Sequence, residues 1–246
     1  ELTGPVGTEV GVKIYRPSEG KTKEYKIVRD RVVIENVYSN VDKGKHVTEY
    51  FAYLLDNKIG YVRLLKFVSD HTSSHLKDAL EKMKKAGAQG LILDLRYNSG
   101  GLLTESIRAA DFFLEKNDIV VVTKGRLPDQ NQEYRARNDE MVDWPMIVLV
   151  NESTASAAEI LAGALQDHDR ALLLGPQGRT TFGKGLVQTI VPLRVSLERD
   201  DKGNDLPNVM QVTTAKYYTP DNAGPDGECI QGIGITPDIT VKLSRK

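Results

Sequence analysis

Three short, largely apolar runs constrain the fold of this 246-residue chain most strongly: Leu91–Leu95, Met146–Val150 and Ala171–Leu174. Runs of this length are typical of strands that are buried on both faces of a parallel sheet. Segments with the apolar spacing of a helix follow the first two runs, at Leu102–Leu114 and Ala155–Leu165. This alternation predicts an α/β fold in which helices cover a mainly parallel sheet.

Strand-like segments flank this core, and they are Glu9–Tyr15, Glu24–Val28, Tyr50–Leu55, Ile59–Phe67, Val187–Val191 and Val209–Tyr218. Short polar turns separate the first pair and the second pair, so each of these pairs predicts a β-hairpin. His75–Lys85 has helical spacing, with Ser73 or Ser74 as its expected cap. Arg126–Asp143 is polar and irregular, which predicts a surface excursion.

The composition excludes several classes of protein. Lys and Arg number 33 against 34 Asp and Glu, and the positive residues are scattered, which argues against a nucleic acid as main partner. The apolar runs are too short to cross a bilayer. The lone Cys229 cannot form an internal disulfide, and no zinc-binding pattern surrounds it. The chain begins at Glu1 without a methionine, so we expect a mature or trimmed chain whose targeting segment was removed.

A serine and a lysine each follow one of the predicted strands. Ser156 lies after Met146–Val150, in the first turn of a predicted helix, where free N–H groups and the helix dipole favour a developing oxyanion. Lys184 lies after Ala171–Leu174, between two glycines and among apolar neighbours. A desolvated lysine can accept a serine proton, so the pattern indicates a nucleophile and its base. The residues alone leave open a small packing serine and a solvent-exposed loop lysine.

Two other kinds of site compete with this interpretation. Gly178–Lys184 has the spacing of a phosphate-binding loop, but Gly185 replaces the expected Ser or Thr, and a strand rather than a helix is predicted to follow. His168 lies about 18 Å from Ser156 by helical rise, too far to act as its base. The remaining histidines lie in polar segments without zinc-binding spacing, and they are His46, His71 and His75. We therefore expect no nucleotide, no metal and no other cofactor.

Eight segments match the motifs of one peptidase family in order, namely Gly4–Thr8, Gly60–Arg63, Leu91–Gly101, Val150–Ile160, Ala162–Asp167, Thr181–Gly185, Ala215–Pro220 and Gly234–Asp238. Through them the chain resembles the C-terminal processing peptidases, also called tail-specific proteases, over essentially its whole length. The resemblance implies a crotonase-like, ClpP-related α/β core with β-rich flanking segments. It also implies a serine endopeptidase that uses a Ser/Lys dyad to cleave proteins near their C-termini.

The resemblance assigns catalytic roles by position. The family's nucleophile falls on Ser156, its base on Lys184, and the glutamine that supports the lysine on Gln188. Ser153 lies one position before the serine motif and is not the nucleophile on this alignment.

Further roles follow in the same way. The family's oxyanion donors are backbone N–H groups, which fall on Gly100 or Gly101 together with Ala157. Three supporting positions of the family fall on Glu159, Asp167 and Thr181. Glu159 lies one turn along the helix from the serine, and the residues alone leave open that it is a solvated helix charge.

Two regions depart from the family pattern. Gly175–Thr180 is longer than the usual link, so we expect it to bulge outward, with release of Lys184 from the site as the alternative. Residues 1–35 resemble only the C-terminal part of a PDZ domain, which precedes a catalytic core at residues 36–246. The carboxylate-binding loop and the peptide groove of that domain would lie upstream.

The resemblance implies a protein or peptide substrate bound as an extended strand, and Val209–Tyr218 offers an edge for it. It allows for a regulatory or adaptor protein, whereas nucleic acids and nucleotides are not expected. It also implies export to the periplasm or another extracytoplasmic compartment, with a membrane anchor allowed in the full-length protein. A different class stays open, a peptide-binding scaffold that is inactive without its PDZ domain or a partner.

Overall fold

The computed structural model describes residues 5–29, 37–38, 52–55, 57–67, 71–137, 142–193, 208–224 and 227–242. The chain divides into two compact units, Glu1–Ile34 and Glu35–Lys246. In the described part of the smaller unit, β1 (Glu9–Arg16) pairs antiparallel with β2 (Lys21–Val28), which confirms the first predicted hairpin. A two-stranded hairpin is common to many folds, so the origin of this unit in a PDZ domain stays a prediction.

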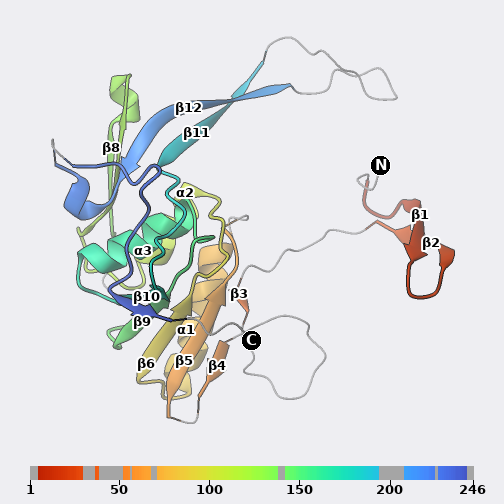
Figure 1. Ribbon diagram of the computed structural model, residues 1–246, viewed down its shortest axis with the longest axis horizontal. Coiled ribbons are helices and arrows are strands. Elements are labelled where there is room, and N and C mark those ends of the chain that lie inside the picture. Colours follow the sequence, from red (N-terminus) through yellow and green to blue (C-terminus); the bar gives the residue numbers. More distant parts are fainter. Residues whose placement is uncertain are drawn as a thin grey trace. The chain divides into compact units, whose positions relative to one another are not determined.

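A mainly parallel sheet forms the centre of the larger unit (Figure 1). Its strands are β3 (Val37–Tyr38), β4 (Ala52–Leu54), β5 (Ile59–Leu64), β6 (Gly90–Asp94), β9 (Met146–Leu149), β10 (Leu172–Pro176) and β13 (Ile239–Val241). The order is β13-β10-β9-β6-β5-β3, and β4 also pairs with β5. Strands β5, β6, β9, β10 and β13 are parallel, whereas β3 and β4 are antiparallel to β5. The predicted α/β sheet and the second predicted hairpin are therefore confirmed.

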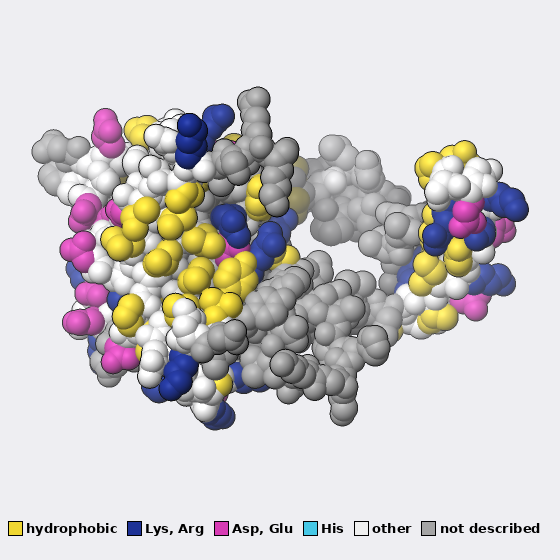
Figure 2. Space-filling view, turned by 60° about the horizontal axis from the view of Figure 1, so that its bottom comes forward, with side chains coloured by type: hydrophobic (Ala, Val, Ile, Leu, Met, Phe, Trp, Pro, Cys, Tyr) yellow, Lys and Arg dark blue, Asp and Glu magenta, His cyan; other side chains and the backbone are white. Residues whose placement is uncertain are grey.

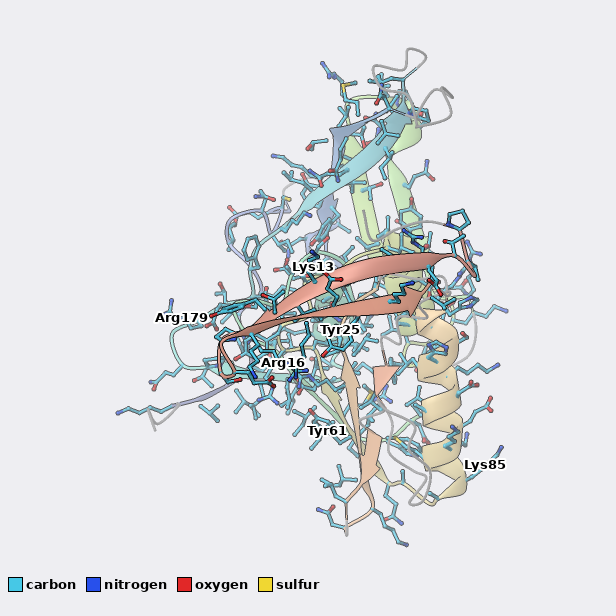
Figure 3. All side chains as sticks on the ribbon, turned by 90° about the vertical axis from the view of Figure 1, so that its right-hand side faces the viewer. Lys13, Arg16, Tyr25, Tyr61, Lys85 and Arg179 are labelled. Atoms are coloured by element: carbon cyan, nitrogen blue, oxygen red, sulfur yellow. The ribbon has the colours of Figure 1, made fainter. Side chains whose placement is uncertain are left out.

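In the described part of the chain, the connections between these parallel strands contain the helices α1 (Thr72–Lys85), α2 (Leu103–Ala110) and α3 (Ala157–Asp167). Helix α1 joins β5 to β6 and ends at Lys85 (Figure 3), while α3 joins β9 to β10. Helices α2 and α3 contact each other. Their inward side chains are fully or almost fully buried, among them Leu76, Leu80, Met83, Ile107, Ile160, Leu161 and Leu165. Removal of these apolar surfaces from water is the main force that stabilises the unit.

A second, antiparallel sheet has the order β11-β12-β7-β8. Its strands are β7 (Ile119–Gly125), β8 (Gln132–Arg135), β11 (Leu186–Pro192) and β12 (Val209–Tyr218). Strand β12 pairs with β11 from Val209 to Lys216, but with β7 only from Ala215 to Tyr218. The β11–β12 ribbon therefore extends beyond β7, and Figure 1 shows it projecting from the body of the unit.

The surface of the larger unit carries exposed hydrophobic residues. Tyr97, Phe182 and Ile190 are each more than half exposed. Figure 2 shows one face of this unit, on which hydrophobic side chains gather and Lys and Arg side chains lie beside them. Within the described ranges, no helix combines the length and the apolar character needed to span a lipid bilayer.

Helix α1 begins earlier than the sequence predicts, at Thr72, and His71 is its N-cap. The predicted caps, Ser73 and Ser74, lie inside the helix instead. The Ser74 hydroxyl donates to the His71 carbonyl at 2.8 Å, and the Ser73 N–H donates to Glu105 Oε2 at 2.8 Å. A buried carboxylate from α2 thus satisfies an N–H of the first turn, which a local side-chain cap would otherwise satisfy.

The segment Arg126–Asp143 is more ordered than predicted. It contains a 3-10 helix, η1 (Pro128–Gln130), followed by β8, which pairs with β7. The Thr123 hydroxyl of β7 donates to the Gln130 carbonyl at 2.9 Å, and Tyr134 packs against the core. These tertiary contacts hold a polar sequence in a strand that its local pattern does not indicate. Residues 138–141 of this segment lie outside the described residues.

Candidate active site

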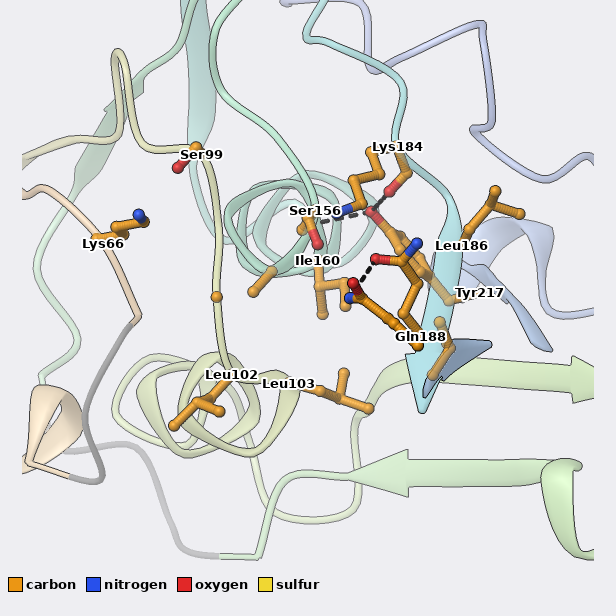
Figure 4. Close-up of a pocket in the computed structure, with 14 residues that line it drawn as sticks. Lys66, Ser99, Leu102, Leu103, Ser156, Ile160, Lys184, Leu186, Gln188 and Tyr217 are labelled. Carbon is orange, nitrogen blue, oxygen red and sulfur yellow. Dashed lines mark hydrogen bonds between the residues drawn. The ribbon is translucent and has the colours of Figure 1, made fainter. Parts of the chain in front are cut away.

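A cleft of about 580 Å³ opens where the loops after the parallel strands meet β11 and β12 (Figure 4). It is lined by Lys66, Ser99, Gly101, Leu102, Leu103, Ser156, Ala157, Ile160, Lys184, Leu186, Val187, Gln188, Gln211 and Tyr217. Ser156 follows β9 and Lys184 follows β10, so both predicted side chains reach one cleft. The predicted residues Gly101, Ala157 and Gln188 line the same cleft.

Ser156 has an unusual backbone conformation. Its φ is 57° and its ψ is −122°, in a region that non-glycine residues rarely occupy and that costs about 1–3 kcal/mol. The residue is the N-cap of α3, its N–H donates to Glu159 Oε2 at 2.7 Å, and its carbonyl accepts from the Glu159 and Ile160 N–H groups. These hydrogen bonds hold the sharp turn between β9 and α3. The half-buried Ser156 side chain consequently lies in the cleft (Figure 4).

Glu159 is fully buried and accepts four hydrogen bonds. Oε2 accepts from the N–H groups of Ser156 (2.7 Å) and Lys184 (2.9 Å). Oε1 accepts from the Thr181 hydroxyl at 2.5 Å and from the Gly183 N–H at 2.7 Å. The alternative that Glu159 is a solvated helix charge is therefore wrong, because its carboxylate joins the serine turn to the lysine loop. Hydrogen bonds to a charged acceptor are worth about 1.5–3 kcal/mol each.

The loop that carries Lys184 turns tightly against the C-terminal segment. A Cβ atom on Gly185 would lie 2.6 Å from Cys229 Sγ, and Gly183 has a φ of 81°, so larger residues would not fit at either position. The Thr181 hydroxyl also accepts from the Ile235 N–H at 2.7 Å, which ties the loop to the chain end. Lys184 is half-buried and its side chain points toward Ser156 (Figure 4). The alternative that Lys184 is released from the cleft is therefore wrong. The exposure of Gln177–Arg179 agrees with the expected outward bulge of the longer link.

A glycine turn after β6 lies directly against the serine. A Cβ atom on Gly100 would lie 2.7 Å from Ser156 Cβ and 2.8 Å from the Ala157 nitrogen. The Gly100 N–H donates to Asn98 Oδ1 at 2.9 Å, so it is already engaged. Buried Asn98 also donates through Nδ2 to the Leu64 carbonyl at 2.8 Å. Among the described residues, the N–H groups of Gly101 and Ala157 have no acceptor, and both residues line the cleft.

Tyr217 is a site residue to which the sequence assigned no role. Its side chain is almost fully buried, and its hydroxyl lies within hydrogen-bonding distance of the Ser156 carbonyl at 3.1 Å and also of the Lys184 carbonyl (Figure 4). Burial, followed by the nearby Glu159 and Cys229, raises the pKa of Tyr217 far above its usual value. The phenol therefore stays protonated and can donate. The only sequence signal was its place in the matched segment Ala215–Pro220.

Gln188 lies on β11 beside an irregularity in the strand register between Val187 and Gln188. Its Oε1 accepts from Gln211 Nε2 on β12 at 2.8 Å, and both amides line the cleft. Gln188 is exposed and lies four positions after Lys184 in the chain.

Asp167 lies at the other end of α3 and does not line the cleft. One of its oxygens accepts the Asp221 N–H at 2.9 Å, and so holds the 3-10 helix η2 (Pro220–Asn222) that follows β12. Burial raises the pKa of the Asp167 carboxyl, although a hydrogen bond with Thr219 opposes the shift. Asp167 therefore contacts the chain that follows Tyr217 rather than the cleft, and its supporting role stays a prediction.

A buried acid anchors the loop that precedes the glycine turn. Asp94, at the end of β6, accepts from Tyr61 at 2.6 Å and from Arg96 Nε (2.9 Å), Nη2 (2.7 Å) and N–H (3.0 Å). Burial alone would raise the pKa of Asp94, but the hydrogen bonds from Arg96 and Tyr61 lower it below the usual value. Burial and the Asp94 contact raise the pKa of Tyr61, on β5 (Figure 3), to about 12.

The competing sites have no support in the geometry. The segment after Lys184 is β11 rather than a helix, so Gly178–Lys184 lacks the helix N-terminus of a phosphate-binding loop. His168 follows the last residue of α3, and its Nε2 lies 2.8 Å from the Ile119 carbonyl. In the described parts of the chain, no three His, Cys, Asp or Glu residues are grouped as metal ligands.

Comparison with known proteins identifies the family. Residues 58–241 match the model of peptidase family S41. The chain belongs to this family. The S41 model covers the whole antiparallel sheet and the central sheet from β5 to β13, and it leaves out β3 and β4. The prediction that the chain is a serine-type peptidase is therefore confirmed.

Named relatives within S41 are carboxy-terminal-processing proteases. One from Bartonella bacilliformis is 39% identical over 98% of the chain, and one from Picosynechococcus sp. is 35% identical over 98%. The chain spans about half the length of these curated relatives, 49% and 50%. A solved structure of a photosystem II D1 C-terminal processing protease has a TM-score of 0.61 at 30% identity, covering 97% of this chain and 57% of that one. The resemblance to C-terminal processing peptidases is thus confirmed.

Proposed function

We propose that this S41 chain is a serine endopeptidase that cleaves protein substrates near their C-termini, with Ser156 as nucleophile and Lys184 as base. One observation carries the proposal: a single buried oxygen, Glu159 Oε2, accepts hydrogen bonds from the N–H groups of both Ser156 and Lys184. The two segments that carry the dyad are therefore fixed relative to one atom. A nucleophile and a base need such a fixed geometry to react together.

The chemistry follows in two halves. A neutral Lys184 amine takes the Ser156 proton while Oγ bonds to the substrate carbonyl carbon and the C=O π electrons move to its oxygen. When the tetrahedral intermediate collapses, the C–N bond breaks and the Lys184 ammonium returns the proton to the leaving amine. Lys184 then accepts a proton from water, whose oxygen attacks the carbonyl carbon of the acyl-serine. When this second intermediate collapses, the bond from that carbon to Ser156 Oγ breaks, Oγ takes the proton back from Lys184, and the second product leaves with a new carboxyl group. Gln188 lines the same cleft, and the family resemblance assigns it the support of this lysine.

The oxyanion accepts hydrogen bonds from the N–H groups of Gly101 and Ala157. Both residues line the cleft, whereas the Gly100 N–H donates to Asn98. Ala157 is also the first residue of α3, where the helix dipole favours negative charge. Each donor of this kind contributes about 3–4 kcal/mol to transition-state stabilisation.

The substrate binds as an extended strand on the edge of β11. The predicted edge on β12 is only partly available, because Ala215–Tyr218 already pair with β7 on that side. Strand β11 pairs only with β12 among the described strands, and its first residues Leu186–Gln188 line the cleft. Main-chain hydrogen bonds to this edge would carry the scissile peptide past Ser156.

Further parts of the proposal concern the whole protein. Because the chain spans about half of its relatives, the crotonase-like core and the PDZ origin of residues 1–35 are part of this proposal rather than findings. So are export to an extracytoplasmic compartment and control by a regulatory or adaptor protein.

The proposal is tested by incubating a peptide substrate with the protein and identifying the cleavage products by mass spectrometry. Ser156→Ala abolishes cleavage while the fold and peptide binding persist, since only the attacking hydroxyl is removed. Ser153→Ala is the matched control three positions away, and it keeps turnover. Wild-type turnover by the Ser156 variant contradicts the proposal, and peptide binding without turnover by the unmodified protein points instead to the scaffold alternative.

A further inference from the structure

Lys66 occupies a fixed place on the wall of the cleft. It follows β5, and the next residue, Phe67, is fully buried and forms a parallel bridge with Gly101. The Phe67 N–H donates to the Gly100 carbonyl at 2.9 Å, and the Leu102 N–H donates to the Phe67 carbonyl at 2.6 Å. The main chain of Lys66 therefore lies alongside the glycine turn.

The charges of the cleft are one-sided. Among the described residues, its lining includes two lysines, Lys66 and Lys184, and no Asp or Glu. Lys184 points toward Ser156 (Figure 4), for which it is the proposed base. Lys66 is exposed, and in the described part of the chain no carboxylate lies within ion-pair distance of its Nζ. A cleft with these charges attracts an anionic group of the substrate.

A second donor lies on the same side of the nucleophile. Ser99 is exposed and lines the cleft two residues before Gly101, on the segment that pairs with Phe67. In the view of Figure 4, Lys66 and Ser99 lie on one side of Ser156, and Lys184 lies on the other. An ammonium and a hydroxyl are the donors that a carboxylate accepts from.

We propose that Lys66, assisted by Ser99, forms a subsite that recognises a carboxylate of the substrate on the side of Ser156 remote from Lys184. This inference rests on the proposed peptidase function and adds a determinant of its specificity. The carboxylate comes from an Asp or Glu side chain or from the free C-terminus of the substrate. It is read within the catalytic unit, separately from the PDZ loop that the resemblance puts upstream.

Peptide binding to the Ser156→Ala protein tests the subsite without cleavage. Fluorescence anisotropy gives Kd for matched pairs that differ only in Glu against Gln at one position, or only in a free-acid against an amidated end. We expect one pair to show tighter binding of the carboxylate form, by about threefold to tenfold for an exposed ion pair at low salt. The preference falls as salt rises. The pair that shows it identifies the source of the carboxylate.

Substitutions assign the preference to Lys66. Lys66→Gln removes it, Lys66→Arg keeps it, Lys66→Glu reverses it, and Ser99→Ala reduces it. Lys85→Gln, at the exposed end of α1, is the matched control and leaves it unchanged. An unchanged ratio of Kd values in Lys66→Gln, or no preference in any pair, overturns the inference.

Turnover of the same peptides by the protein with Ser156 intact separates this inference from the proposed function. If that protein cleaves the peptides without a Lys66-dependent preference, only the subsite is wrong. If it cleaves none of them while the binding preference still depends on Lys66, the subsite stands and the peptidase assignment is wrong.

Discussion

Glu159 Oε2 accepts a hydrogen bond from the Lys184 N–H at 2.9 Å, although the two residues lie 25 positions apart in the chain. The same oxygen accepts from Ser156 at 2.7 Å. One side chain on the first turn of α3 therefore controls the position of both members of the proposed dyad. We therefore propose that Glu159 is a positioning residue, and we expect its removal to affect reaction geometry more than substrate affinity.

Glu159→Gln tests that role. The amide keeps the volume, but its NH₂ group cannot accept hydrogen bonds, so two of the four buried donors lose their partner. We expect kcat/KM to fall about a hundredfold, mainly through kcat. The free energy of unfolding falls by about 2–4 kcal/mol in urea titrations. The exposed neighbour Glu152, changed to Gln, is the control and keeps both values. A rise in KM with kcat unchanged would contradict the positioning role.

Lys184→Arg tests the base. Arginine retains its proton at any pH that the fold tolerates, so it cannot accept a proton from Ser156. Cleavage is therefore lost at every pH at which the wild-type protein is active. Stopped assays of both proteins over a pH series measure this. Substantial turnover by Lys184→Arg would exclude a Ser/Lys mechanism.

Tyr217→Phe tests the phenol that faces the carbonyls of Ser156 and Lys184. The substitution keeps the buried ring and removes only the hydroxyl, which leaves both carbonyls without this donor. We expect about a tenfold lower kcat and about 1–2 kcal/mol less stability. Tyr218→Phe is the matched control, because its ring alone contacts Lys124. Equal effects of the two substitutions would show that the Tyr217 hydroxyl has no special role.

Asp94→Asn tests the acid that anchors the loop before the glycine turn. The pKa of Asp94 is lowered in the folded state, so its charge adds stability above the unfolded-state pKa of about 3.9. That contribution is lost as pH falls through the lower folded-state pKa. The wild type should therefore exceed the variant by about 2 kcal/mol in free energy of unfolding at pH 7, with the difference shrinking below about pH 4. Asp129→Asn, on an exposed residue, shows no such pH-dependent difference.

The strands, and the place of Ser156 and Lys184 in one cleft, could be predicted because their signals are local. Short apolar runs precede Ser156 and Lys184, and parallel strands deliver such residues to one sheet edge. The start of α1 was missed because its first turn is satisfied by Glu105, 32 positions away from Ser73, rather than by an adjacent side chain. Strand β8 was missed because its pairing with β7 overrides a polar sequence.

The hydrogen bonds around Ser156 and Lys184 could not be predicted either, because they join residues that lie far apart in the chain. Tyr217 lies 61 positions from Ser156, and no spacing in the sequence indicates that its hydroxyl faces the Ser156 carbonyl. Asn98 engages the Gly100 N–H through a turn whose geometry depends on contact with Leu64 and Ala155. Residue types indicate which groups can react, whereas the packed fold determines which partner each group has.

The lysine loop is held mainly in its C-terminal half, and its start is anchored by the Gln177 N–H, which donates to the Val241 carbonyl at 3.0 Å. Glu159 binds its residues 181, 183 and 184, and Gln231 Oε1 accepts the Gly185 N–H at 2.9 Å. The preceding stretch, Gln177–Arg179, is exposed, and nothing lies within 4 Å of a Cβ atom built on Gly178. Residues added to this turn should therefore not displace Lys184. The turn is suited to the insertion of an affinity tag or a spectroscopic reporter.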